Sequence, residues 1–349
     1  MKAALVTGSG GLIGSACVQL LCAQGWAVTG VDNDLRAWFF GPAASTAARV
    51  RELAQTWPRY THSHLDLRDR ESVRCLVAEL RPSFIIHTAA QPSHDRAAAI
   101  PAEDFDVNAG GTLNLLLAAR AAAPEAPFCF TSTNKVYGDR PNQLLLRQLP
   151  TRFDYADGRD GIDEQMPVDQ CLHSLFGASK LAADLLCQEY GRYFGMPIGI
   201  FRGGCLTGPD HAAVELHGFL NYMVRCAVQG RPYTIYGYQG KQVRDQIHAA
   251  DVAQLFLHFY AAPRAGDVYN LGGGRENSLS LLEALAALRD RGFGLQTHYL
   301  DQPRAGDHIC YISDLSKLRR HFPAWSIQHP LSRILDEIVQ ALAPARQAA

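Results

Sequence analysis

The 349-residue chain lacks a strong net charge, closely paired cysteines and any long apolar run. Its 33 lysine and arginine residues nearly balance 34 aspartate and glutamate residues, which leaves a net charge of −1. This charge gives no electrostatic reason to expect nucleic acid or an anionic membrane as a partner. No apolar run approaches the roughly 18 residues that span a bilayer. The N-terminal apolar stretch is broken at Gly8, Gly10 and Gly11, so we do not expect a signal peptide.

The nine cysteines are scattered, and no C-x-x-C pair occurs among them. Most stand in apolar runs, where cysteine behaves as a small hydrophobic residue. This usage favours a reducing cytoplasm over a disulfide framework or a zinc site, and no metal is expected. Apolar residues make up 47% and charged residues 19% of the chain, which is typical of a globular protein with an ample core.

What is present begins with a strand, a turn, a helix and a second strand. Ala3–Thr7 is a short apolar run, a glycine-rich turn covers residues 8–14, and an amphipathic helix precedes a second apolar run at Ala27–Val31. Glycines let a backbone approach a pyrophosphate, which sits at the positive N-terminus of the helix. Asp32 follows this second run, where a carboxylate bonds the adenosine ribose and repels a 2′-phosphate. The unit predicts dinucleotide binding, with NAD favoured over NADP.

Strands and helices continue to alternate along the first half of the chain. A third strand is expected to end at His64–Leu67. Further strands are expected over Phe84–Ala90, Phe128–Thr131 and Pro197–Arg202. This alternation predicts an α/β fold with a doubly wound parallel sheet of the Rossmann type. Such a sheet binds its ligands at the carboxyl ends of the strands.

Polar residues stand at or beyond the ends of these strands. Asp66 either accepts a hydrogen bond from the adenine amino group or acts as a turn or N-cap acid. Thr133, in the segment Thr131–Asp139, either bonds a substrate hydroxyl or carbonyl or caps a helix or turn. Asn108, on a helix expected over 107–121, is expected to tie neighbouring backbone segments together.

A helix is expected to begin within His173–Lys180, because residues beyond it recur at helical spacing. Phe176 and Lys180 are four residues apart, so both project from one face. On these residues alone, the pair is interpreted as an aromatic ring packed over a lysine stem. The alternative is a catalytic lysine whose expected partner, a tyrosine one turn earlier, is missing.

Beyond Thr207 the pattern changes to shorter helices and strands, which predicts a smaller, mixed α/β C-terminal substrate domain. The polar, proline-containing segment Arg140–Gln170 is expected to lie over the active site as a lid. The predicted domains are 1–206, with returning segments near 242–272, for NAD binding, and 207–241 with 273–349 for substrate binding.

Charged residues in the second half are interpreted as substrate contacts. Lys241 and Arg244 are expected to grip a pyrophosphate, for which a guanidinium fork is suited. A structural salt bridge remains an alternative for Arg244, with Asp245 as its partner or as a turn cap. Arg304 and Asp307 are expected to form a pair that closes the site.

Other local signals predict secondary structure. Gly203–Pro209 is expected to be a glycine-rich loop near the nicotinamide and the sugar, or a plain turn. Helices are expected over Leu216–Val228 and Leu331–Leu342, and Asp251 is expected to be the N-cap of the helix that follows it. Residues Ala343–Ala349 are expected to fray.

Together these motifs resemble the extended short-chain dehydrogenase/reductases that act as NAD-dependent nucleotide-sugar epimerases and dehydratases. The resemblance covers about residues 1–325. It rests on Thr7-Gly8-x-x-Gly11-x-x-Gly14, Asp32, Asp66-Leu67, Thr133 before Val136-Tyr137-Gly138, Ser179-Lys180, Arg244-Asp245, Asn270-Leu271-Gly272-Gly273 and Arg304-Ala305-Gly306-Asp307.

The resemblance implies oxidation of a sugar carbon by hydride transfer to tightly held NAD. The keto intermediate is then rotated or deprotonated, and the hydride is returned. In such enzymes a tyrosinate is usually the general base, and a lysine four residues later lowers its pKa and binds the nicotinamide ribose. Thr133 and Lys180 match this pattern, but Phe176 stands at the tyrosine position. A phenyl ring cannot accept a proton.

Three explanations for Phe176 remain open. Another group acts as the base, namely Lys135, His173, Cys171 or Tyr137; a desolvated Lys135 would be neutral enough for this role. Alternatively, the protein binds NAD and a nucleotide sugar without turning the sugar over. In the third explanation, Phe176 is a substitution introduced to remove the base.

We therefore predict an NAD-dependent epimerase of a nucleotide-activated sugar, with a nucleotide-sugar 4,6-dehydratase as the alternative. The expected ligands are NAD and a nucleotide-diphosphate sugar. By resemblance, helices Asn108–Arg120 and Lys180–Arg192 imply a homodimer. The expected catalytic residues are Thr133, Lys180, Lys135 and Phe176. The implied cofactor contacts are Gly8, Gly11, Leu12, Ile13, Gly14, Asp32, Asn33, Asp66, Leu67, Thr88, Ala89, Ala90, Asn108, Thr131, Lys180 and Gly203. The implied substrate contacts are Gln91, Thr133, Asn134, Arg202, Lys241, Arg244, Arg304 and Asp307.

Overall fold

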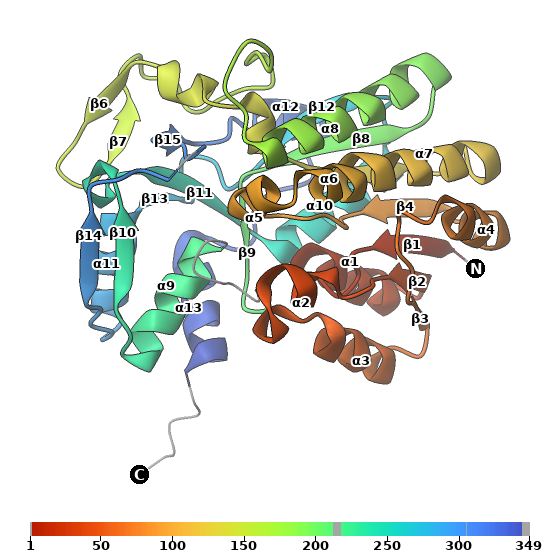
Figure 1. Cartoon of the computed structure of the whole chain (residues 1–349), viewed down its shortest axis with the longest axis horizontal. Coiled ribbons are helices and arrows are strands. Elements are labelled where there is room, and N and C mark those ends of the chain that lie inside the picture. Colours follow the sequence, from red (N-terminus) through yellow and green to blue (C-terminus); the bar gives the residue numbers. More distant parts are fainter. Residues whose placement is uncertain (1, 212–217, 305, 344–349) are drawn as a thin grey trace.

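The larger part of the protein is a seven-stranded parallel sheet with helices on both faces (Figure 1). The computed structural model describes residues 2–211, 218–304 and 306–343. The strand order is β12, β8, β5, β4, β1, β2, β3, and neighbouring strands pair in parallel. The doubly wound α/β fold predicted from the alternation is thereby confirmed. The strands are β1 Ala3–Thr7, β2 Ala27–Val31, β3 Tyr60–Ser63, β4 Phe84–His87, β5 Phe128–Thr133, β8 Ile198–Gly203 and β12 Asp267–Leu271.

Each face of this sheet has its own apolar core, because successive strand residues point to opposite faces. Every residue of β4 and β8 is buried, as expected for central strands of a parallel sheet. One core joins the sheet to α1, α3, α10 and α12, and the other joins it to α4, α7 and α8. The helices are α1 Leu12–Ala23, α3 Ala47–Thr56, α4 Arg70–Leu80, α7 Gly111–Ala122, α8 Leu175–Phe194, α10 Ala249–Ala261 and α12 Ser316–His321.

The direction in which the sheet grows reverses between β1 and β4. From β1 the chain first adds β2 and β3 on one side, then returns to add β4, β5, β8 and β12 on the other. Loops from the two directions diverge at this point and leave a crevice at the carboxyl ends of the strands. Three short helices follow β2 or β4 near this edge (Figure 1). They are α2 Leu35–Phe40, α5 His94–Ala99 and α6 Pro101–Phe105.

The smaller part of the protein packs beside this edge and contains two further small sheets (Figure 1). In one, β11 pairs with β9, β13 and β15; in the other, β10 pairs with β14. Helices α9, α11 and α13 share an apolar core with β10 and β13. The bounds are β9 Cys205–Thr207, β10 Tyr233–Tyr236, β11 Val243–His248, β13 Ser278–Ser280, β14 Thr297–Leu300, β15 Cys310–Tyr311, α9 Phe219–Gln229, α11 Leu281–Asp290 and α13 Leu331–Leu342.

Most predicted element positions agree with these bounds, and α13 has the predicted ends. The first two residues of the predicted Leu216–Val228 helix, Ala305 and residues 344–349 lie outside the described residues. Three boundaries were wrong. β3 ends at Ser63, before His64–Leu67, and β4 ends at His87, before Ala90. The predicted loop at Gly203–Pro209 contains strand β9. No helix within the described ranges combines the length and apolarity that a membrane span needs.

The expected N-cap role of Asp251 is also wrong. Helix α10 begins at Ala249, and its cap is the His248 side chain, whose Nδ1 accepts from the Ala250 amide at 3.1 Å. Asp251 instead lies in the first helical turn. Its carboxylate accepts hydrogen bonds from the backbone amides of Gln328 and His329 and so fixes the chain that leads into α13.

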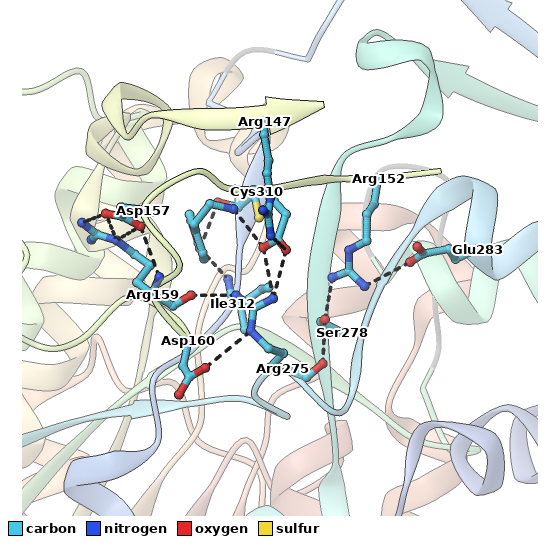
Figure 2. Close-up of polar contacts among 12 residues, drawn as sticks. Arg147, Arg152, Asp157, Arg159, Asp160, Arg275, Ser278, Glu283, Cys310 and Ile312 are labelled. Carbon is cyan, nitrogen blue, oxygen red and sulfur yellow. Dashed lines mark hydrogen bonds and ion pairs between the residues drawn. The ribbon is translucent and has the colours of Figure 1, made fainter. Parts of the chain in front are cut away.

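The insertion over Arg140–Gln170 does not cover the cavity, so the lid prediction is wrong. It forms a hairpin of β6 Leu146–Gln148 and β7 Phe153–Tyr155. Polar contacts connect this hairpin to the second sheet, which is the one formed by β9, β11, β13 and β15 (Figure 2). Arg152 donates to the Ser278 hydroxyl at 2.7 Å and pairs with Glu283 at 3.4 Å. From the other side, Arg275 pairs with the carboxylate of Asp154 at 3.0 Å. The insertion therefore braces the smaller part of the protein.

A buried ion pair locks α8 to the main sheet. The Asp184 carboxylate, which is 0% exposed, accepts from Arg202 Nε at 3.0 Å and Nη2 at 2.9 Å. It also accepts from the Ser132 hydroxyl and the Gln188 amide, each at 2.6 Å. Burial lowers the pKa of Arg202, but the paired Asp184 outweighs it, so the net pKa is raised. A buried charge with all its partners satisfied is costly to disturb from one side only.

We expect Asp184→Asn to destabilise the protein by about 3–5 kcal/mol, because the Arg202 guanidinium stays buried without its countercharge. Urea unfolding measures this loss. Asp184→Asn combined with Arg202→Met is expected to recover part of the stability. Asp157→Asn, which removes an exposed pair with Arg159, serves as the control and should leave the midpoint almost unchanged. A wild-type midpoint in Asp184→Asn would contradict the role assigned to this pair.

Candidate active site

One continuous cavity of about 500 Å³ lies at the carboxyl ends of the main strands and extends to the second sheet. This volume is in the range of small-molecule and cofactor sites. The turn after β1 and the ends of β2, β4 and β5 line one end, and β10, β11 and Leu281 line the other. A ligand lying along this cavity would contact both parts of the protein.

The turn after β1 is shaped for close approach of backbone to ligand. Gly8 has a φ of +69°, and the Gly11 amide donates to the Gly8 carbonyl at 2.9 Å. A Cβ atom at Gly14 would lie 2.0 Å from that same carbonyl oxygen, so α1 begins in direct contact with the turn. First-turn amides of a helix have no intrahelical partner, and here they open beside the cavity. This arrangement fits a pyrophosphate.

Asp32 lies at the cavity wall, where it also holds the surrounding loops. Its carboxylate accepts from the Gly10 amide, the Asp34 amide and the Thr46 hydroxyl, each at 2.9 Å. A carboxylate offers about four acceptor positions, so one remains for a ribose hydroxyl. Its negative charge also disfavours a 2′-phosphate at this place.

Asp66 lines the cavity but is already bonded. Its carboxylate accepts from the side chain and the backbone amide of Arg68, with Nη2 at 2.6 Å and the amide at 2.9 Å. The local pairing is that of a turn acid, one of the two predicted roles. The Arg68 hydrogen bond lowers the pKa of Asp66, so its carboxylate stays ionised at neutral pH.

The cavity brings together most of the sequence-predicted cofactor residues, and it leaves two of them outside its lining. Gly14 lies behind the turn, as described above. Asn108 is saturated: its Oδ1 accepts from the Gln91 amide at 3.0 Å, and its Nδ2 donates to the Ser179 hydroxyl at 3.0 Å. It ties neighbouring backbone as predicted. The predicted cofactor residues in the lining are Gly8, Gly11, Leu12, Ile13, Asp32, Asn33, Asp66, Leu67, Thr88, Ala89, Ala90, Thr131, Lys180 and Gly203.

Lys180 and Phe176 lie where the cofactor end of the cavity meets its middle. Lys180 Nζ donates to the Thr131 carbonyl at 2.8 Å and lies 4.3 Å from the centroid of the Phe130 ring. Burial lowers the pKa of Lys180 to about 8. The Phe176 ring is 6% exposed and faces the same cavity. Both side chains therefore line the cavity, but the phenyl ring of Phe176 has no group that can titrate.

Of the four residues considered as replacement bases, Lys135 is the one in the cavity lining. Tyr137 is fully buried, donates to Asn270 Oδ1 at 2.7 Å, and has a pKa raised by burial to about 12. His173 Nε2 is bonded to the Val168 carbonyl at 2.7 Å. The Cys171 thiol lies 3.6 Å from the Tyr137 carbonyl. Three of the four are thus held away from any ligand in the cavity.

Lys135 follows β5 in a short 3-10 turn whose N-cap is Thr133. The Thr133 hydroxyl, which lines the cavity, accepts from the Lys135 amide at 3.2 Å, so it is also a cap. Lys135 Nζ donates to the Gly306 carbonyl at 2.9 Å and lies 4.0 Å from Asp307 Oδ1. Burial lowers the pKa of Lys135 to about 8, partly offset by Asp307. This lysine can exchange its proton near neutral pH.

The other end of the cavity contains Arg244 and Arg304, and their pairings differ from those predicted. Arg244 pairs with Asp307, and Arg304 pairs with Asp95 at 2.8 Å, so the expected Arg304–Asp307 pair is wrong. Burial raises the pKa of Asp307, but Arg244 and Lys135 outweigh it and lower the net pKa. Asp245 accepts from backbone amides, including that of Ser313 at 3.0 Å, and is not the partner of Arg244.

Three predicted substrate residues do not line the cavity. Arg202 is held in the buried pair with Asp184. Gln91 is fully buried and bonds the backbone of Ser93. Lys241 is likewise absent from the lining, and its carbonyl accepts from the Phe153 amide. The predicted substrate residues in the lining are Thr133, Asn134, Arg244, Arg304 and Asp307.

Sequence reasoning missed several lining residues. Gln242 and Gln246 each lie two residues from Arg244, so all three side chains point to the same face of β11 and its N-terminal extension. The alternation of side chains along a strand would have identified both glutamines. His94, the first residue of α5, lines the cavity beside Phe176. Its place after Ser93 resembles an ordinary helix start, so no local pattern marks it.

Comparisons with known proteins agree with this geometry. CDP-paratose 2-epimerase from Salmonella typhi is 32% identical over 322 residues, covering 90% of this chain and 91% of that protein. A dTDP-glucose 4,6-dehydratase from Neisseria meningitidis is 30% identical, covering 92% and 87%. UDP-glucose 4-epimerase from Thermus thermophilus, solved in complex with NAD, superposes with a TM-score of 0.79 at 26% identity, covering 99% and 100%.

The segments Ser132–Asp139 and Gly240–Asp245 resemble those of CDP-paratose 2-epimerase, and the similarity over 90% of this chain agrees with that resemblance. The family profile described as "NAD dependent epimerase/dehydratase family" matches residues 4–272, which is more than half of the chain. The glycine turn and Asp32 at the cavity fit the cofactor of this family. The chain belongs to the NAD dependent epimerase/dehydratase family, and its cofactor is NAD.

Proposed function

We propose that the protein is an NAD-dependent epimerase of a nucleotide-activated sugar. The observation that carries the proposal is one continuous cavity that joins a dinucleotide site to an end containing Arg244 and Arg304. Thr133, Lys135 and Lys180 also line this cavity. Bound NAD would take a hydride from a sugar carbon and later return it. The similarity to CDP-paratose 2-epimerase over 90% of the chain supports a nucleotide sugar as the substrate class.

Each end of the cavity has a proposed role. The glycine turn and the N-terminus of α1 hold the cofactor pyrophosphate, and Asp32 holds the adenosine ribose. Lys180 binds the nicotinamide ribose through its ammonium group. At the other end, Arg244 and Arg304 bind the substrate diphosphate, since a guanidinium presents paired donors to phosphate oxygens. Thr133 bonds a sugar hydroxyl or carbonyl.

Among the groups named from the sequence, Lys135 is the one proposed to act at the sugar oxygen. Its side chain is 15% exposed and lines the cavity, and burial lowers its pKa to about 8. At pH 7 such a lysine is mostly protonated. In its protonated form it stabilises negative charge that develops on a sugar oxygen.

Two other functions remain to be separated from epimerisation. The similarity to dTDP-glucose 4,6-dehydratases supports a dehydratase, and Phe176 supports a protein that binds both ligands without turnover. Incubation with CDP-, UDP- and GDP-hexoses, followed by NMR in deuterated water, distinguishes them. Inversion through a carbanion incorporates deuterium, and inversion by rotation of a keto sugar gives a new isomer without it. Dehydration gives a keto-deoxy sugar, and a binder gives no product.

Replacement of Lys135 tests its place in the chemistry. We expect Lys135→Met to lower kcat by about 10²–10⁴-fold, because the variant keeps the side-chain length and loses the transferable proton. The rate is measured by NMR on the hexose that the wild type converts. Lys241→Met, at a lysine outside the cavity lining, is the matched control. A wild-type rate in Lys135→Met would exclude Lys135 from acting at the sugar oxygen.

Replacement of Phe176 tests whether the native base lies elsewhere. We expect the wild type to convert its substrate and Phe176→Tyr to keep a rate of the same order, because the wild type already has an acceptor. The same NMR assay measures both rates. If the wild type is inactive and Phe176→Tyr is active, the chain lacks a base of its own, and either the binding role or a removed base is correct.

Homodimer formation and a cytoplasmic location are also proposed. Helices α7 and α8 lie side by side on one face of the sheet (Figure 1). On α8, Leu185 is 45%, Tyr193 79% and Phe194 40% exposed, which suits burial against a second copy. Light scattering of the intact protein, compared with that of Leu185→Glu, tests the dimer. A monomer mass for the wild type would contradict it.

A further inference from the structure

His94 stands directly beside the ring that replaces the family's tyrosine. The centroids of the His94 and Phe176 rings are 5.5 Å apart, with an angle of 37° between their planes. Both rings line the cavity. His94 is the first residue of α5, whose N-cap Ser93 accepts from the Arg96 amide at 3.3 Å, so the backbone at this point is fixed. The imidazole therefore presents nitrogen atoms where the phenyl ring has none.

The other side of the imidazole faces Gly306. A Cβ atom at Gly306, whose φ is +70°, would lie 3.2 Å from His94 Nδ1, so a larger residue there would crowd the ring. Nδ1 is buried and has no hydrogen-bond partner among the described residues. The nitrogen that remains for a ligand in the cavity is Nε2.

The charges around His94 keep the ring neutral. Lys135 and Arg304 face it as cations, and Asp95 and Asp307 face it as anions. Burial, followed by the two cations, lowers the pKa of His94 to about 3. A neutral imidazole has a free lone pair and acts as a proton acceptor at pH 7, whereas a protonated lysine has none.

We propose that His94 is the proton acceptor that takes the place of the missing tyrosine. This proposal rests on the proposed function. NAD held at the glycine turn would supply the hydride acceptor. The His94 imidazole would take the proton of the sugar hydroxyl as the C–O bond becomes C=O. The imidazolium keeps this proton until the hydride returns, and then gives it back to the oxygen. No further oxidant or reductant is needed, since the same electron pair and proton are returned.

Lys135 has a different part in this scheme. Its Nζ is already bonded to the Gly306 carbonyl and attracted to Asp307, and both contacts favour the protonated form. As a cation it holds the sugar oxygen while His94 takes the proton. A diphosphate on Arg304 would cancel part of the positive charge that faces His94. We therefore expect substrate binding to raise the pKa of His94 from about 3 towards its ordinary range.

The experiment combines turnover with NMR of the histidine rings in the full-length protein loaded with NAD. We expect His94→Gln to lower kcat by about 10²–10⁴-fold while a nucleotide sugar still binds. Phe176→Tyr added to His94→Gln should restore much of the rate, because a tyrosine hydroxyl then stands beside position 94. The same Tyr added to Lys135→Met should not restore it. His173→Gln, at a histidine held outside the cavity, is the matched control.

The pH profile separates the two candidate acceptors. With His94 as acceptor, kcat/KM falls as the pH rises through about 8, because Lys135 must stay protonated to hold the sugar oxygen. With Lys135 as acceptor, kcat/KM rises with pH through about 8, because the neutral amine must form. A rise of this kind would overturn the proposal for His94.

The ring resonances give a readout that does not depend on a variant folding well. In ¹⁵N-histidine-labelled wild type, the His94 signal should shift on addition of the converted CDP-, UDP- or GDP-hexose more than on addition of the nucleotide diphosphate alone. Equal shifts, or turnover that survives His94→Gln within twofold, would overturn the role of His94 and leave the proposed function intact. A wild type that converts none of these sugars would overturn both.

Discussion

The close approach of α1 to the turn after β1 is the constraint on which the cavity depends. A side chain at Gly14 would collide with the Gly8 carbonyl, and one at Gly8 would lie 2.7 Å from the Ala89 amide nitrogen. Without those side chains, α1 begins at the edge of the sheet and the loop after β4 passes directly over it. The first-turn amides, Asp32 and the small residues after β4 then face one volume. The absence of side chains at Gly8 and Gly14 thereby allows the close packing that forms the cofactor end of the cavity.

The cofactor end of the site is predictable from the sequence because its signals are local. The glycine turn and Asp32 lie within one strand–helix–strand unit, and their spacing alone defines the geometry. The parallel sheet is predictable for a related reason, since buried strands alternate with helices of ordinary length. The strand ends were less well defined. The polar run at His64–Leu67 continues past β3 as an irregular segment that lines the cavity, which short-range hydrophobicity does not reveal.

The polar pairings at the substrate end are not predictable, because they join distant parts of the chain. Arg244 pairs with Asp307, 63 residues away, and Arg304 donates to Asp95, 209 residues away. For each arginine the sequence offers a nearer carboxylate, and burial of the two chain segments decides between them. The same holds for the insertion at 140–170. Its polarity suggested a lid, but its arginine and aspartate contacts are directed to the second sheet.

The missing hydroxyl at position 176 and the neutral imidazole at position 94 belong to one arrangement. Phe176 comes from α8, His94 from α5, Lys135 from the turn after β5, and Gly306 from the chain that follows β14. The phenyl ring gives the imidazole an apolar neighbour, and the two nearby cations oppose its protonation. Because Gly306 belongs to the smaller part of the protein, this group is complete only when the two parts are packed together.

That packing also couples ligand binding to proton chemistry. An anion held by Arg244 and Arg304 would weaken the repulsion of Lys135 by both arginines and the repulsion of His94 by Arg304. The pKa values of Lys135 and His94 would therefore rise on binding. The ion pairs that hold these arginines in the absence of ligand, to Asp307 and Asp95, would weaken at the same time. The released carboxylates face His94 and would stabilise an imidazolium. Binding of an anionic diphosphate by the two arginines would thus make His94 a stronger base. Proton acceptance would therefore depend on the presence of the substrate.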